Sequence, residues 1–141
     1  MSAWYPGLGT ALQQRLDTIQ RKVVRYANGW RPRSHVGAQE ISAVGWLCFP
    51  KRVQFSKLCQ LFKVRMGVAP DYLSADFIHL RDTHSHSTRG SDLNYFADSR
   101  KFPPGTFHYS VVREWNDLPD TIKKARNLVG FKRELRKHLS L

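Results

Sequence analysis

Apolar side chains cover most of the circumference of one predicted helix, over residues 50–67. Pro50 suits the first turn of a helix, and Gly67, followed closely by Pro70, suits its end. A helix with so wide an apolar surface must be covered on several sides, so the rest of the chain is predicted to surround it. Its apolar positions are Val53, Phe55, Leu58, Cys59, Leu61, Phe62, Val64 and Met66.

Two amphipathic helices are predicted to border this central helix. The first covers about residues 9–28 and stops at Gly29, because apolar residues recur at helical spacing up to that point. Its apolar positions are Leu12, Leu16, Ile19, Val23 and Tyr26. The last helix begins after Asn127, a good N-cap residue. Its narrow apolar arc consists of Leu128, Phe131, Leu135 and Leu139.

Shorter elements are predicted between these helices. Residues 71–80 and 111–115 suit short helices, and Asp117 and Asp120 resemble a capping box for a restart. Residues 93–109 alternate poorly, which leaves one short β-hairpin as an open alternative. The expected fold class is mainly α, a small helical domain around a central buried helix with a long basic loop. One domain over residues 1–141 is expected: a helix (1–30), a basic loop and connector (31–49), and a helical core (50–141).

The charge of the chain favours an anionic partner. It has 23 Lys and Arg against 11 Asp and Glu, a formal charge of +12 and a pI near 10.2. Residues 1–70 contain 11 basic and 2 acidic side chains (11 − 2 = +9), whereas residues 71–141 contain 12 and 9 (12 − 9 = +3). Such an excess favours nucleic acid over an acidic membrane surface. The phosphate-binding surface is therefore expected mainly in the first half.

Candidate nucleic-acid-binding residues follow from this charge distribution. The densest group interleaves basic and aromatic side chains, which suits phosphate contacts combined with stacking on unpaired bases. It consists of Arg15, Arg21, Lys22, Arg25, Trp30, Arg31, Arg33 and His35. Further candidates are Lys51, Arg52, Arg89, Lys132, Arg133, Arg136 and Lys137. For the C-terminal basic residues, the exposed side of a terminal helix is an equally good interpretation.

Other notable residues are predicted to be structural. Trp46, Trp115 and Phe131 have apolar neighbours in the sequence and are expected in the core, and Asn116 is expected to bind backbone groups at a helix break. The remaining members of this set are Phe62, Pro70 and Pro119.

Short motifs occur along the chain in a distinctive order. They are Trp4 to Leu8; Leu16, Gln20, Arg21 and Arg25; Gly45 to Leu47 with Arg52; Gly67, Ala69, Pro70, Tyr72 and Leu73; His84 to Gly90; Trp115 to Pro119; and Phe131 with Lys132. This order resembles the C-terminal region, downstream of the palm and thumb, of non-LTR (LINE-type) retrotransposon reverse transcriptases of the Jockey, CR1 and L2 kind. The resemblance covers nearly the whole chain.

The resemblance implies an accessory region of an RNA-directed DNA polymerase that supports target-primed reverse transcription by gripping RNA or DNA. The first helix would continue from the thumb, and the rest of the parent polymerase would be a partner in cis or in trans. A nuclear or cytoplasmic ribonucleoprotein is the expected setting. The alternative is a protein-interaction or structural module, either a domesticated remnant or a brace for the thumb. A fragment of a larger enzyme would expose an apolar face.

No catalytic centre, cofactor, metal or small-molecule substrate is expected for this chain. Polymerases clamp two divalent metals with paired carboxylates, and no two acidic residues are adjacent here. His84 and His86 have no third ligand at a short spacing, although Cys48, Cys59 or His79 could approach them in space. Asp117 and Asp120 suit helix starts better than a metal cluster with Glu114. Cys48 and Cys59 form no zinc-binding pattern, and no segment approaches the roughly 18 apolar residues of a membrane span.

Overall fold

The protein is mainly helical, as its sequence predicts. The computed structural model describes residues 5–83 and 92–140. Two short 3-10 helices, η1 (Tyr5–Gly7) and η2 (Leu80–Asp82), accompany the α-helices. The α-helices are α1 (Thr10–Ala27), α2 (Ala38–Ala43), α3 (Phe49–Arg65), α4 (Asp71–Ser74), α5 (Phe107–Asn116), α6 (Asp120–Lys123) and α7 (Leu128–Ser140).

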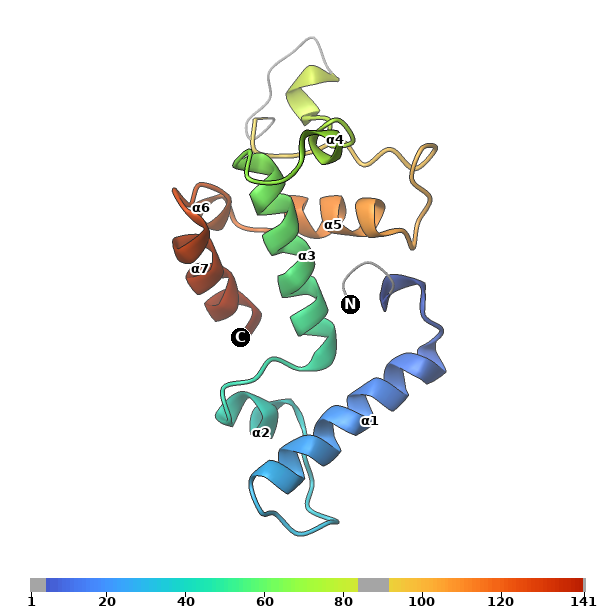
Figure 1. Cartoon of the computed structure of the whole chain (residues 1–141), viewed down its shortest axis with the longest axis vertical. Helices are drawn as coiled ribbons and strands as arrows, with labels where there is room; N and C mark the ends of the chain where they lie inside the picture. The colour runs from blue at the N-terminus through green and yellow to red at the C-terminus, as the bar shows by residue number, and fades with distance from the viewer. Residues whose placement is uncertain (1–4, 84–91, 141) are drawn as a thin grey trace.

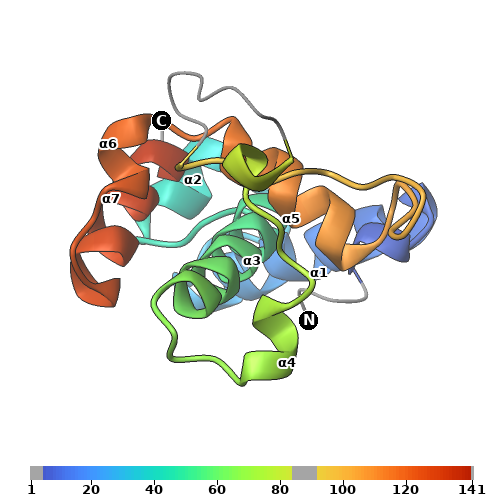
Figure 2. The same cartoon turned by 90° about the horizontal axis from the view of Figure 1, so that it is seen from above.

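The helix α3 is the centre of the molecule. The helix α7 packs along one of its sides and α5 crosses the other, whereas α1 and α2 lie beyond its N-terminal end (Figure 1). The view from above also places α3 between α7 and α5 (Figure 2). The prediction of a central helix flanked by the last helix is therefore confirmed. The first helix also borders the central one, as predicted, because α1 contacts α3, although it lies beyond the N-terminal end of α3 rather than alongside it (Figure 1).

Stacked aromatic rings join the three packed helices. Phe62 of α3 stacks on Phe131 of α7 with ring centroids 4.2 Å apart, and Trp115 of α5 lies 5.7 Å from Phe131. All three side chains are fully buried, which agrees with their predicted structural role. Truncating any one of them to alanine should cost roughly 3–5 kcal/mol, because packing is lost on two other helices at once.

Asn116 anchors the segment before α5. Its side chain donates to the Tyr95 carbonyl at 2.8 Å and accepts from the Tyr95 N–H at 3.0 Å, and the Trp115 indole donates to the Leu93 carbonyl at 2.8 Å. Buried Lys123 donates to Asn94 Oδ1 and to the Asn116 carbonyl, both at 2.8 Å. The Asn116 side chain therefore binds backbone groups, as predicted, but they belong to Tyr95, 21 residues earlier, and not to the helix break.

Several shorter elements differ from the predictions. The helix expected over residues 71–80 ends at Ser74, and the β-hairpin considered for residues 93–109 does not form; instead, His79 makes an isolated bridge to Tyr95. Asp117 ends α5 rather than capping α6, which begins after Pro119. Pro119 and Pro70 occupy exposed N-cap positions, where a residue without an N–H costs little. Asn127 does cap α7, accepting from the Gly130 N–H at 2.8 Å.

A second, smaller cluster joins α1 to α2. It is formed by Val24, Val36 and Ile41, against which Trp30 packs. The α2 helix interrupts the loop predicted for residues 31–49, and Glu40 stabilises its start by accepting from the Gly37 N–H at 2.8 Å. The sequence signal for α2 is weak, because six residues are too few to show a period.

Candidate nucleic-acid interface

The helix α1 has three distinct sides. Gln20 and Val24 face the protein, and the basic residues of α1 lie within roughly a third of the circumference beside them. The remaining side carries the apolar stripe that was predicted to pack in the core. That prediction is wrong: the exposed fractions are 48% for Leu12, 55% for Ile19, 44% for Val23 and 91% for Tyr26. The surface of α1 is therefore basic along one side and apolar along the next.

Two of the predicted basic residues of α1 make contacts within the protein. Arg25 Nε donates to the Ser34 carbonyl at 2.7 Å and so folds the loop after α1 back onto the helix. Arg21 pairs with Asp17, one turn earlier, at 2.7 Å. By contrast, the predicted residues of α1 and its loop that are exposed and have no ion pair among the described residues are Arg15, Lys22, Arg31, Arg33 and His35.

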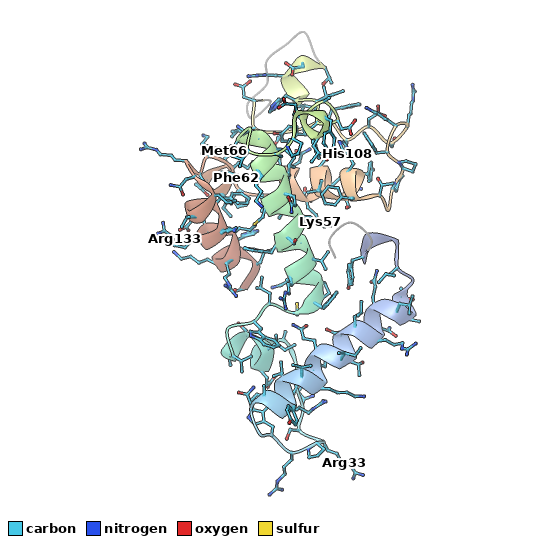
Figure 3. All side chains as sticks on the ribbon, viewed as in Figure 1. Arg33, Lys57, Phe62, Met66, His108 and Arg133 are labelled. Atoms are coloured by element: carbon cyan, nitrogen blue, oxygen red, sulfur yellow. The ribbon has the colours of Figure 1, made fainter. Side chains whose placement is uncertain are left out.

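The loop after α1 projects basic side chains away from the body of the molecule. Gly29 ends α1 with φ +62°, and the Trp30 N–H donates to the Arg25 carbonyl at 3.0 Å. Trp30 was predicted to stack on nucleic-acid bases, but it is half-buried against the second cluster, which restricts access to its ring. Arg33 lies at the tip of the loop and points outward (Figure 3). The loop therefore presents charge more readily than aromatic surface.

A second basic group lies on α7. Lys132, Arg133, Arg136 and Lys137 are all exposed, and Arg133 points away from the helix bundle (Figure 3). Glu134 is 3.0 Å from Arg133 and 3.5 Å from Lys137, and the hydrogen bond from Arg133 lowers the pKa of its carboxyl group. Such exposed pairs are weak, so Arg133 and Lys137 can exchange Glu134 for a phosphate at little cost.

Trp46 is not in the core, contrary to the prediction from its apolar neighbours. Gly45 ends α2 with φ +74°, and the chain then turns so that Leu47 is buried whereas 40% of Trp46 stays exposed. Three hollows meet at Trp46, and their further lining includes Lys51, Arg52, Arg133, Arg136 and Lys137. Predicted binding residues from α3 and α7 thus converge on one aromatic side chain. Sequence reasoning missed this convergence, because the segments are far apart in the chain.

Metal ligation has little support in the described residues, which contain no group of three His, Cys, Asp or Glu side chains able to hold an ion. Glu114 pairs instead with buried Lys57 between α3 and α5, a contact that sequence reasoning also missed. Burial raises the pKa of the Cys59 thiol to about 11, which keeps it protonated. The candidate residues His84, His86 and Arg89 lie outside the described residues.

No protein-family model, curated protein or solved structure matches the chain. The resemblance to LINE-type reverse transcriptases therefore stays a prediction from the order of motifs. Within residues 5–83 and 92–140, no helix is long and apolar enough to cross a membrane. The surface chemistry of α1, its loop and α7 is the main guide to function.

Proposed function

We propose that this protein binds nucleic acid through the basic surfaces of α1, its following loop and α7. The observation that carries this proposal is that these surfaces and the adjoining start of α3 hold exposed cations without acidic partners among the described residues, among them Arg15, Lys22, Arg31, Arg33, Arg52 and Arg136. Surface cations that are not already neutralised can release counterions from a phosphate backbone, which is the main source of sequence-independent affinity. The formal charge of +12 adds long-range attraction.

The proposed setting is an accessory domain of a retrotransposon-encoded RNA-directed DNA polymerase. The ordered motifs that resemble LINE-type reverse transcriptases support this setting, as does the absence of adjacent carboxylates for a two-metal centre. In this proposal the chain helps the parent polymerase to bind RNA or DNA, and the catalytic centre belongs to the parent polymerase.

A charge-matched pair of variants tests the interface. The first replaces Arg15, Lys22, Arg31 and Arg33 by serine, and sparing Arg21 and Arg25 preserves their contacts with Asp17 and Ser34. The control removes four exposed cations elsewhere: Arg100, Arg113, Lys124 and Arg126. Binding to labelled single-stranded RNA should weaken strongly only in the first variant, whose salt slope should fall by about 3, since each lost phosphate contact contributes about 0.7. Equal losses in both variants would refute a localised interface.

A second candidate function is docking to another protein. The exposed stripe of Leu12, Ile19, Val23 and Tyr26 favours it, because soluble proteins seldom leave so many large apolar side chains together on one helix. Replacing Leu12, Ile19 and Val23 by serine separates the two functions. It should leave RNA binding intact if only the basic surface is used, and it should abolish any self-association seen by sedimentation.

A further inference from the structure

Trp46 occupies an unusual position for a tryptophan. It lies in the connection between α2 and α3, where hollows of about 380, 300 and 340 Å³ share Trp46 and Leu47 in their lining. Within the described part of the chain, no hydrogen bond and no aromatic pair engages its indole ring. The 40% of Trp46 that is exposed is therefore apolar surface that a ligand in these hollows can contact.

The backbone on both sides of Trp46 is held in place. The buried Gln20 side chain of α1 donates to the Leu47 carbonyl at 2.8 Å, and Arg136 of α7 donates to the Gly45 carbonyl at 3.0 Å. The Trp46 N–H donates to the Ile41 carbonyl at 3.1 Å, which completes the end of α2. Three elements thus fix the backbone of one short connection, so the place of Trp46 among the helices is set before a ligand binds.

Cations lie around this ring. Arg52 and Arg136 line one hollow together with Trp46, and Arg133 and Lys137 join Arg136 in another. The one carboxylate paired with this group is that of Glu134, which contacts Arg133 and Lys137 and leaves Arg52 and Arg136 without an acidic partner among the described residues. An aromatic ring that lines the same hollows as several guanidinium groups matches an unpaired base and its flanking phosphates.

We propose that Trp46 is a stacking platform for one unpaired base of a single-stranded nucleic acid, with Arg52 and Arg136 contacting the flanking phosphates. This inference rests on the proposed nucleic-acid binding and adds a strand preference to it. In a duplex each base is covered by its neighbours, so the ring has no base face to contact. Single strands therefore use the Trp46 ring in addition to the basic surfaces, whereas duplexes are bound through the basic surfaces alone.

Binding measurements on the full chain with two kinds of ligand, single strands and a duplex, test this inference. The probes are labelled oligouridylate and oligothymidylate of about 12 nucleotides, and a duplex of the same length. Trp46→Ala should weaken single-strand binding by about 5- to 150-fold, the value of one stacked base, and change duplex binding less than twofold. Trp46→Phe should keep most of the affinity. Trp46→Leu, which preserves apolar packing without a ring, should lose as much as Trp46→Ala.

The controls separate the possible failures. Tyr72→Ala removes another exposed aromatic ring, on α4, and should leave both affinities unchanged. Native single-strand binding combined with undiminished binding by Trp46→Leu would overturn the stacking role alone. Equal losses on single strands and duplex would overturn it too, since they would show that Trp46 merely supports the fold. If the native chain bound neither ligand, the proposed nucleic-acid function itself would fail.

Discussion

The buried ion pair between Lys57 and Glu114 predicts an asymmetric response to mutation. The Lys57 side chain is 5% exposed, whereas that of Glu114 is 25% exposed although its Oε2 is buried without a hydrogen-bond partner among the described residues, so the carboxylate has the shorter path to water when its partner is removed. In Glu114→Gln, the Lys57 ammonium keeps only neutral acceptors, the new amide oxygen and Ser110 Oγ at 3.3 Å, and leaving a buried charge uncompensated should cost about 3–5 kcal/mol. In Lys57→Met, the cost should be about 1.5–3 kcal/mol, that of a lost charged hydrogen bond.

Urea denaturation followed by circular dichroism at pH 7 measures both losses. The double variant should be more stable than Glu114→Gln alone, because it leaves no unpaired buried charge. Burial raises the pKa of the Glu114 carboxyl, and the hydrogen bond from Lys57 opposes this rise. A carboxyl with a raised folded-state pKa adds stability at low pH that is lost as the pH rises, so the deficit of Lys57→Met should shrink between pH 7 and pH 5. A Lys57→Met loss as large as that of Glu114→Gln would refute this reasoning.

Two further stability predictions follow from single contacts. Asn116→Ala removes both hydrogen bonds to the Tyr95 backbone and should cost about 2–3 kcal/mol in urea denaturation; a loss below about 0.5 kcal/mol would show that water replaces them. Burial between Phe77 and Phe102 lowers the pKa of His108 below its ordinary 6.5, so its contribution to stability should be present above pH 6.5 and be lost as the pH falls. The stability of His108→Gln should therefore fall less than that of the native chain between pH 7 and 5.5, and equal slopes would contradict this assignment.

Helix periodicity predicted the core elements of the fold but not every packing side. The apolar positions of α3 and α7 repeat often enough to locate both helices, and Phe62 and Phe131 meet as a central helix requires. The same periodicity in α1 indicated the wrong buried side. There the tertiary contacts of Gln20 and Val24 determine the orientation, because the Gln20 amide reaches the Leu47 carbonyl across 27 residues. No local pattern reports such a contact.

The candidate interface was predictable as a set of charges but not as a geometry. Sequence reasoning selected Arg15, Lys22, Arg31 and Arg33, which the structure exposes, together with Arg25, which the loop uses for its own backbone. It placed Trp46 in the core because its neighbours are apolar. The turn at Gly45 buries Leu47 instead, and only the assembled helices bring Arg52 and Arg136 to the indole.

Salt dependence tests the central claim of nucleic-acid binding most directly. The native chain should be titrated with single-stranded RNA, duplex DNA and an RNA:DNA hybrid at several salt concentrations. Eight phosphate contacts predict that the logarithm of the binding constant falls against the logarithm of the salt concentration with a slope near −6 for single strands. Four of these contacts come from α1 and its loop (Arg15, Lys22, Arg31 and Arg33), and four from the cations around Trp46 (Arg52, Arg133, Arg136 and Lys137). Affinity should then fall by about 10³- to 10⁵-fold between 50 and 200 mM salt. Binding that is insensitive to salt, or no measurable binding at 50 mM, would contradict the claim.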